Sequence, residues 1–156
     1  MTEAVSCRAA ASADLPAILR LYAQPDLDGE ALPLADAERL FERIAQYPDY
    51  TIYVAEQGGR IVGTFALLVM PNLGHCGTPS AVIEDVAVDP ACQGRGIGKA
   101  MMRHALRICA EKGCYKAALS SNLKRERAHA FYESLGFERH GYSFRIPLDP
   151  LSHQDC

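Results

Sequence analysis

The chain has 156 residues, of which 49% are hydrophobic and 22% charged, and its formal net charge is −3. This length and apolar content exclude intrinsic disorder and predict a single domain over residues 1–156 with a substantial core. The slightly acidic balance disfavours a nucleic-acid-binding protein, which would need a dominant basic patch.

The sequence predicts no membrane segment, secretory leader or metal site. The longest apolar run, residues 61–70, contains a glycine and a threonine and is far shorter than the roughly 20 residues of a membrane helix. Residues 1–13 lack the apolar stretch of a secretory signal, so we expect a cytoplasmic protein. The six cysteines and five histidines show no C-x-x-C, H-x-x-x-H or H-E-x-x-H spacing, so neither a metal site nor a disulfide framework is expected.

Hydrophobic periodicity predicts five elements in the first half of the chain. They are a strand (6–10), a helix with Ser12 as its N-cap, a second helix (35–47) and two strands (51–55 and 61–69). The two-glycine turn at 57–60 is typical of a β-hairpin between the last two strands. Residues 24–33 are rich in acids and prolines and predict a loop.

The second half of the chain alternates strands with helices. We expect a strand (82–88), a helix (96–112), a short buried strand (115–119), a helix (125–135) closed by Gly136, and one or two final strands (137–146). This mixture, with a hairpin in the middle, predicts an α/β (α+β) fold with a mixed sheet and helices on both faces.

A glycine-rich turn between a strand and a helix gives the clearest chemical signal. Residues 93–99 read Gln-Gly-Arg-Gly-Ile-Gly-Lys, and the glycines leave backbone N–H groups uncovered at the start of the helix. A helix start attracts anions, whereas Arg95 and Lys99 would oppose its dipole unless a phosphate lay between them. A solvated basic turn is the alternative. The spacing fits neither the P-loop nor the dinucleotide-binding pattern.

The strand before this turn carries two adjacent carboxylates, Glu84 and Asp85. Because side chains alternate along a strand, they are expected on opposite faces. One face would hold Val82, Glu84, Val86 and Val88, and the other Ile83, Asp85 and Ala87. At least one carboxylate must then be paired, lie at a bulge or face a cavity. A carboxylate with a raised pKa can take the proton of an amine.

Two motifs together resemble the GNAT superfamily of acyl-CoA-dependent N-acetyltransferases. The first is Gln93-x-x-Gly96-x-Gly98, and the second is Phe131-Tyr132-x-x-x-Gly136-Phe137. The resemblance covers about residues 60–147, whereas the first sixty residues fit the family only by their pattern of elements. It implies a mixed, mostly antiparallel sheet of six or seven strands with a splayed central pair and helices on both faces.

The resemblance implies an N-acetyltransferase that moves acetyl from acetyl-CoA to a primary amine of a small molecule, by direct attack in a ternary complex and without a metal. In the family the glycine turn binds the pyrophosphate of the coenzyme. The implied coenzyme-binding residues are Val86, Ala87, Val88, Gln93, Gly94, Arg95, Gly96, Ile97, Gly98, Lys99, Asn122, Ala128 and Tyr132.

The resemblance also assigns catalytic roles. The carboxylate strand is expected to bulge, and a backbone N–H near Val86 would polarise the thioester carbonyl. Glu84 is the first candidate for the base and Asp85 the second, the alternatives being a structural or substrate-positioning acid and a base role for water. Tyr132 would protonate the departing thiolate, with a packed core tyrosine as the alternative.

The acceptor stays open at this stage. Acids in the first loop (Asp26, Asp28 and Glu30) would suit a cationic amine if they bordered its pocket, and His75 and Cys76 could border it too. Residues 113–116, together with 83–88, resemble glucosamine-phosphate acetyltransferases. Residues 121–124 and 128–132 resemble bacterial acetylators of small amines, including aminoalkylphosphonates. The motifs are also compatible with a protein or peptide N-acetyltransferase and with a non-catalytic acyl-CoA-binding sensor. Many members of the family dimerise, so the resemblance allows a homodimer.

Overall fold

A computed structural model describes residues 3–148 of the chain. These residues belong to two compact units, the first ending at Leu119 and the second beginning at Ser120, and each is described by itself. The expectation of one domain over residues 1–156 stays a prediction.

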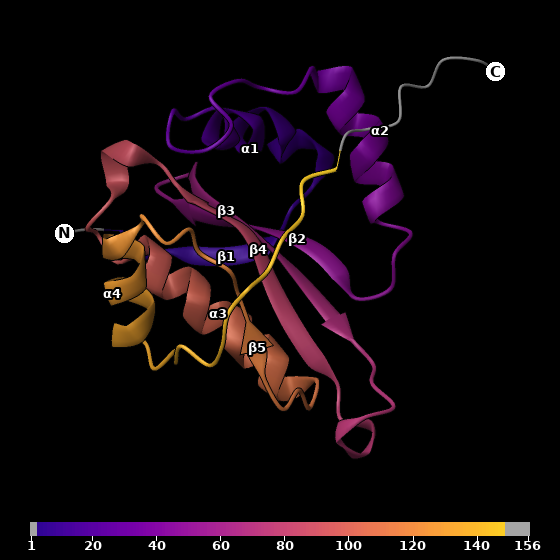
Figure 1. Cartoon of the computed structure of the whole chain (residues 1–156). Coiled ribbons are helices and arrows are strands. Elements are labelled where there is room, and N and C mark those ends of the chain that lie inside the picture. The colour runs from indigo at the N-terminus through magenta and orange to yellow at the C-terminus, as the bar shows by residue number, and fades with distance from the viewer. Residues whose placement is uncertain (1–2, 149–156) are drawn as a thin grey trace. The chain divides into compact units, whose positions relative to one another are not determined.

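The first unit is built on a five-stranded sheet in the order β1-β2-β3-β4-β5 (Figure 1). The strands are β1 (Ser6–Ala9), β2 (Tyr50–Gln57), β3 (Arg60–Met70), β4 (Ser80–Val88) and β5 (Ala117–Ala118). Neighbours from β1 to β4 run antiparallel, and β5 pairs with β4 in parallel. The sheet is therefore mixed and mostly antiparallel, as the sequence predicts.

The hairpin between β2 and β3 follows from two glycines. Gly58 and Gly59 have φ angles of 59° and 73°. A two-residue turn with positive φ at both positions twists in the same sense as the flanking strands, and glycine adopts these angles without a steric penalty. The predicted hairpin is confirmed, and it aligns two long neighbouring strands of the sheet.

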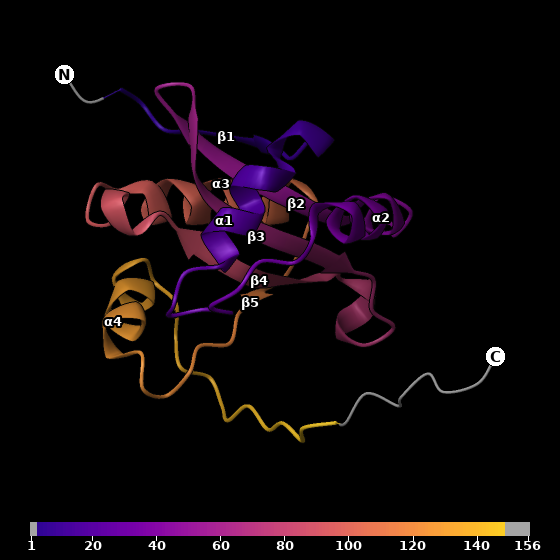
Figure 2. The ribbon, with the colours of Figure 1, turned by 90° about the horizontal axis from the view of Figure 1, so that it is seen from above.

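Helices cover both faces of this sheet (Figure 2). The helices of the first unit are α1 (Leu15–Tyr22), α2 (Leu34–Ile44) and α3 (Ile97–Glu111). Leu15 and Ile18 of α1 form a core with Val54 of β2, and Phe41 of α2 packs against it. On the other face, Gly63 leaves room for Ile97 and Met101 of α3. No helix within residues 3–148 is long and apolar enough to cross a membrane.

The second unit contains α4 (Glu126–Ser134), and the final strands expected over residues 137–146 are absent from its described residues. Tyr142, Phe144 and Ile146 are exposed there. A strand forms only where a neighbouring strand satisfies its N–H and C=O groups, and an alternating sequence alone does not supply that partner. The described sheet thus has five strands, and the expected six or seven are not confirmed.

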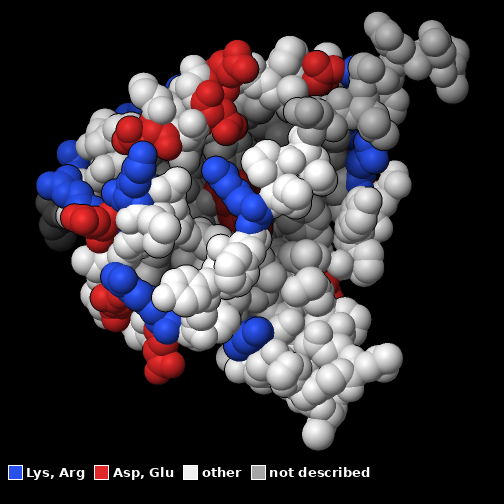
Figure 3. Space-filling view, viewed as in Figure 1, with Lys and Arg blue, Asp and Glu red and all other residues white. Residues whose placement is uncertain are grey.

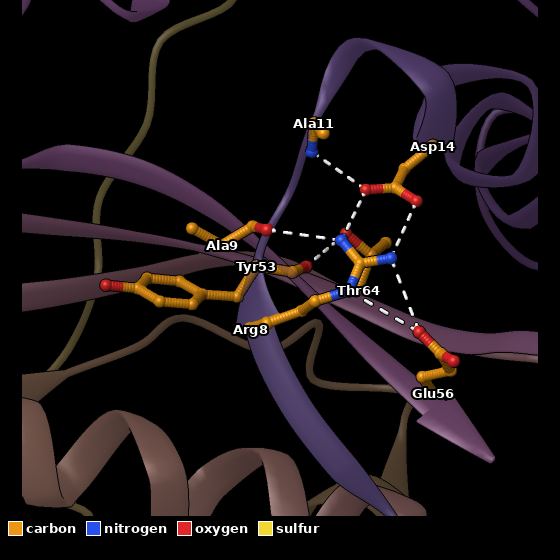
Figure 4. Close-up of polar contacts among 7 residues, drawn as sticks. All are labelled: Arg8, Ala9, Ala11, Asp14, Tyr53, Glu56 and Thr64. Atoms are coloured by element: carbon orange, nitrogen blue, oxygen red, sulfur yellow. Dashed lines mark hydrogen bonds and ion pairs between the residues drawn. The ribbon is translucent and has the colours of Figure 1, made fainter. Parts of the chain in front are cut away.

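Charged side chains of both signs are interspersed on the face seen in Figure 3. Arg8 of β1 forms ion pairs with two acids, Asp14 and Glu56 (Figure 4). The Arg8 guanidinium donates to both carboxylate oxygens of Asp14, at 2.7 and 2.9 Å, and the Ala11 N–H donates to Asp14 at 2.7 Å. Arg8 also pairs with Glu56 at 3.3 Å. Asp14, rather than the expected Ser12, therefore satisfies a backbone N–H before α1.

Substitution Asp14→Asn should destabilise the fold. The side chain of Asp14 is almost buried, and hydrogen bonds from Arg8 hold the pKa of its carboxyl below the usual value. We expect the free energy of unfolding at pH 7 to fall by about 1–3 kcal/mol, measured by urea denaturation. A lowered folded-state pKa gives stability that is present above the unfolded pKa of about 4 and is lost as the pH falls through the folded value. The variant should lack this acid-side contribution.

The control is Asp36→Asn, because Asp36 pairs with Arg39 one helical turn away on an exposed surface. Exposed pairs contribute little, so its effect should stay within about 1 kcal/mol. Equal losses in the two variants would contradict a special role for the buried carboxylate.

Candidate active site

A β-bulge lies in the middle of β4. Thr64 of β3 pairs with Ala87, and Ala66 pairs with Glu84, so Asp85 and Val86 together oppose the single residue Phe65. Asp85 has a φ angle of 52°, in the left-handed region that residues other than glycine seldom adopt. One extra residue in one strand of an antiparallel pair defines a bulge, which was one of the expected ways to accommodate a carboxylate here.

The bulge makes the predicted alternation of side chains wrong. Residues directly opposite each other on neighbouring strands share a face, so Glu84 and Ala87 lie on the face of Ala66 and Thr64. The charges of Asp85 and Glu84 both raise the pKa of the Tyr50 hydroxyl, after the larger effect of burial. The two carboxylates therefore act on the same region, because the extra residue interrupts the alternation of side chains between the two faces of the sheet.

Strands β4 and β5 separate next to this bulge. The ladder between β4 and β5 contains only the pairs Ala81–Ala117 and Val82–Ala118, whereas β4 continues to Val88. Within the described residues of the first unit, the β4 edge from residue 83 onward has no strand beside it. This is the expected splay, and it leaves backbone groups of β4 available to a ligand.

The direction of the free backbone groups follows from two hydrogen bonds. The Asp89 N–H donates to the Val62 carbonyl of β3 at 2.8 Å. Backbone groups alternate between the two edges of a strand, so Ala87 also faces β3, while Val86 and Val88 face the free edge. The side chain of Gln24 confirms this direction by donating to the Val88 carbonyl at 3.1 Å. Val86 therefore presents its N–H to the splay.

A pocket of about 140 Å³ lies beside the bulge and is lined by Tyr22, Leu27, Asp28 and Asp85. The loop after α1 carries Asp28 to this place. It folds back through a hydrogen bond from the Asp28 N–H to the Tyr22 carbonyl (3.1 Å), and Gln24 fastens it to β4. Of the three acids in this loop, Asp28 lines the pocket, whereas Asp26 and Glu30 do not.

The surroundings of Asp85 favour the protonated form of its carboxyl group. Partial burial raises the pKa of Asp85, and the negative charge of Asp28 raises it further. Burial, followed by the charge of Asp85, raises the pKa of Tyr22 as well. A carboxylate with a raised pKa is a better proton acceptor at neutral pH. Of the two adjacent carboxylates on β4, Asp85 lines the pocket and Glu84 does not. Which of them acts as the base stays a prediction.

The glycine turn forms the start of α3 as predicted. Gly94 and Gly96 have φ angles of 79° and 80°, and Gly96 is the N-cap of the helix. No side chain within the described residues caps this end, and a Cβ added at Gly94 or Gly96 would meet nothing within 4 Å. The side chain of Ile97 is buried and fixes the helix against the sheet. The first N–H groups of α3 are thus available to an anion.

The exposed side chains at the same end of α3 are Gln93, Arg95 and Lys99, and Gly98 is partly buried. The turn is tightened by Asp89, which accepts a hydrogen bond from the Ala91 N–H at 2.9 Å. Two cations around an uncapped helix start suit a pyrophosphate better than they suit the helix dipole.

The sequence motif that ends in Gly136-Phe137 forms the C-terminal end of α4 in the second unit. The Phe137 N–H donates to the Tyr132 carbonyl (3.1 Å) and the Gly136 N–H to the Glu133 carbonyl (3.0 Å), with φ of 93° at Gly136. This is a Schellman motif, which a contact between side chains at its two ends often accompanies. The rings of Tyr132 and Phe137 accordingly lie 5.7 Å apart. Burial raises the pKa of Tyr132.

The remaining predicted residues also belong to this unit. Asn122 uses its side-chain oxygen locally, accepting the Lys124 N–H at 2.9 Å before α4 begins. Ala128 lies partly buried on α4. Asn122, Ala128 and Tyr132 therefore share one unit, while residues 84–99 belong to the other.

Sequence reasoning missed three residues of the pocket region: Tyr22, Gln24 and Leu27. In the sequence, Tyr22 looks like one of the apolar residues of a helix, and Gln24 and Leu27 lie in a loop without a motif. Their only indication in the sequence is that they lie directly before or within an acidic loop. Within residues 3–148 no three His, Cys, Asp or Glu residues gather so that they could hold a metal ion.

Comparisons with known proteins identify the family. The sequence profile described as Acetyltransferase (GNAT) family matches residues 15–137. The chain is 35% identical over 138 residues to the glucosamine 6-phosphate N-acetyltransferase of Trypanosoma brucei brucei, covering 88% of each chain. It is 29% identical over 136 residues to aminoglycoside N(6')-acetyltransferase type 1 of Stenotrophomonas maltophilia, covering 85% of each.

A solved structure described as a transcriptional regulator from Bacillus halodurans C-125 also has this fold. It superposes with a TM-score of 0.86 at 29% sequence identity, over 93% of this chain and 100% of that one. The chain thus belongs to the GNAT acetyltransferase family, whose members take the acetyl group from acetyl-CoA, and it is an acyltransferase of this kind.

Substitution Gly96→Ala should strain the turn before α3. A residue with a Cβ loses about 1–2 kcal/mol in the left-handed conformation that Gly96 adopts. We expect a loss of about this size in the free energy of unfolding, measured by urea denaturation. The control is Gly74→Ala, since Gly74 also has open space around it but a φ of −66°. That variant should be neutral or more stable by up to about 1 kcal/mol. Equal stability of the two variants would show that the turn tolerates another conformation.

Proposed function

We propose that this protein transfers an acetyl group from acetyl-CoA to a primary amine of a small molecule, by direct attack within a ternary complex. The observation that carries the proposal is the acidic pocket at Asp85, which lies beside the free edge of the bulged strand β4. An amine in the pocket would thus be close to the backbone that holds the donor. The names of the Trypanosoma and Stenotrophomonas relatives, both N-acetyltransferases of small molecules, support this class of acceptor.

The first unit supplies the features that would hold the coenzyme. The backbone groups of Val86 and the N–H of Val88 can pair with an extended arm as an added strand would. The turn from Gln93 to Lys99 offers the pyrophosphate uncapped N–H groups and two cations. The family resemblance adds Asn122, Ala128 and Tyr132 of the second unit to this set.

The proposed chemistry needs a proton acceptor, an oxyanion donor and a proton donor. The amine enters as an ammonium ion, and Asp85 removes its proton directly or through water. The Val86 N–H polarises the thioester carbonyl while the C–N bond forms and the C–S bond breaks. Tyr132 gives its proton to the departing thiolate, and the acetylated nitrogen loses its second proton, which returns to Tyr132 through water.

Mass-spectrometric detection of acetylated products tests the function. Acetyl-CoA is incubated with glucosamine phosphates, aminoalkylphosphonates, amino acids, polyamines, aminoglycosides and peptides. We expect a small-molecule product heavier by one acetyl group. Product mass is preferable to a thiol dye because free cysteines of the chain, such as the exposed Cys76, would raise the background. Coenzyme binding without turnover of any amine would overturn the proposal and favour a non-catalytic acyl-CoA-binding sensor.

Glucosamine 6-phosphate is the second candidate acceptor. The observation in its favour is the 35% identity to the Trypanosoma enzyme of that name over 88% of both chains. The same mixed panel distinguishes it from other amines.

Substitution Asp85→Asn should lower kcat by about 10²–10⁴-fold, the range for removal of a general base. The wild-type rate should rise with pH as Asp85 loses its proton, at a pKa above the ordinary value of about 4. This acid limb should be missing in the variant. Glu84→Gln is the matched control, because Glu84 is adjacent in sequence but does not line the pocket. A larger loss for Glu84→Gln than for Asp85→Asn would restore Glu84 as the base.

Substitution Tyr132→Phe should reduce kcat more than it weakens acetyl-CoA binding. The variant keeps the ring that packs against Phe137 and removes the hydroxyl alone. Steady-state kinetics and calorimetric titration of acetyl-CoA give the two quantities. An unchanged kcat would remove Tyr132 as the proton donor.

A further inference from the structure

Both charged side chains that line the pocket are acids. Asp28 comes from the loop after α1 and Asp85 from the bulge in β4, and Tyr22 and Leu27 complete the lining. The pocket therefore has a negative wall on two sides, contributed by elements far apart in the sequence.

The two carboxylates have no counter-ion among the described residues. The ion pairs within residues 3–148 engage Asp14, Asp36, Asp49, Glu56, Glu111 and Glu133. Asp28 and Asp85 are in none of them, although they are close enough for the charge of Asp28 to affect the carboxyl of Asp85. Like charges at short range are unfavourable, and a bound cation relieves them.

The fold holds the acids in this unfavourable arrangement. Gln24 ties the loop to the Val88 carbonyl, and the Asp28 N–H is bonded to the end of α1. Asp85 is held in a left-handed conformation that costs an aspartate free energy. The backbone of both acids is thus held in place before any ligand arrives, which lowers the entropic cost of binding.

We propose that the acceptor is a diamine or a longer polyamine, whose reacting nitrogen lies at Asp85 while a second ammonium group is held by Asp28. This inference rests on the proposed function and concerns the same site. The lining favours a second positive charge and disfavours a phosphate, so the acceptor would differ in charge from that named for the Trypanosoma relative.

The proton and charge balance of the step is complete. Asp85 takes one proton from the reacting ammonium, and the neutral nitrogen forms a bond to the thioester carbonyl carbon. The C–S bond breaks, and the thiolate receives a proton from Tyr132. The acetylated nitrogen then releases its second proton, which restores the Tyr132 hydroxyl through solvent, and Asp85 gives the first proton to solvent. The second ammonium keeps its proton and its pairing with Asp28 throughout. The products are a monoacetylated polyamine and the free coenzyme thiol.

Matched acceptors test the inference. We compare kcat/KM for 1,3-diaminopropane with that for propylamine, and for glucosamine with that for glucosamine 6-phosphate. The diamine should exceed the monoamine by about tenfold, which corresponds to about 1.4 kcal/mol. Glucosamine 6-phosphate should be a poorer substrate than glucosamine.

Three variants assign the preference to Asp28. Asp28→Asn should reduce the preference for the diamine about fivefold or more, mainly through KM, whereas Asp28→Glu should preserve it because the charge remains. Asp26→Asn, two residues away in the same loop but outside the pocket lining, should leave the preference unchanged. Retained preference in Asp28→Asn, or an equal loss in Asp26→Asn, would overturn the inference.

The outcomes separate this inference from the proposed function. Efficient acetylation of glucosamine 6-phosphate without preference for diamines overturns the diamine inference and leaves an N-acetyltransferase. Coenzyme binding without turnover of any amine overturns the proposed function itself.

Discussion

The extra residue opposite Phe65 is the constraint on which the rest of the candidate site depends. It brings Asp85 to the pocket and returns the Val86 N–H to the free edge of β4. A regular strand of the same sequence would separate Glu84 from Asp85 and point one carboxylate into the face covered by α3. The position of the acidic pocket beside the free edge is therefore a consequence of one irregular pairing.

Packing on the opposite face keeps that pairing in place. Phe65 is fully buried and stacks on Tyr53, with ring centroids 5.1 Å apart. Gly63 admits Met101 of α3 where any larger side chain would collide with the sulfur. Residues 62–67 of β3 are buried on both faces of the sheet, so a slip of one residue would exchange their side chains between two differently packed faces. Phe65 would then point toward α1, and the space at Gly63 would no longer face α3. An irregular functional element is thus held by a regular core.

Local features could be predicted from the sequence, whereas features that depend on strand register could not. The hairpin at 57–60 and the turn around Gly96 follow from glycines whose positive φ is a local requirement. The motif ending in Gly136-Phe137 is equally local, because one helix end satisfies its own carbonyls. In contrast, the shared region of Glu84 and Asp85 depends on how β4 pairs with β3. The roles of Tyr22 and Gln24 depend on a loop folding back onto β4, and residues 137–146 illustrate alternation without a pairing partner.

The left-handed conformation of Asp85 also sets the stability of the fold against the proposed role of this residue. At this position a glycine would relieve the backbone strain, and an asparagine would tolerate it better than most residues do. Either change would remove a carboxylate that repels Asp28, so selection for heat resistance alone would favour losing the acid. If the chain is selected for both activity and greater stability, the stabilising substitutions should therefore occur in the core or on the surface, while this aspartate stays in place.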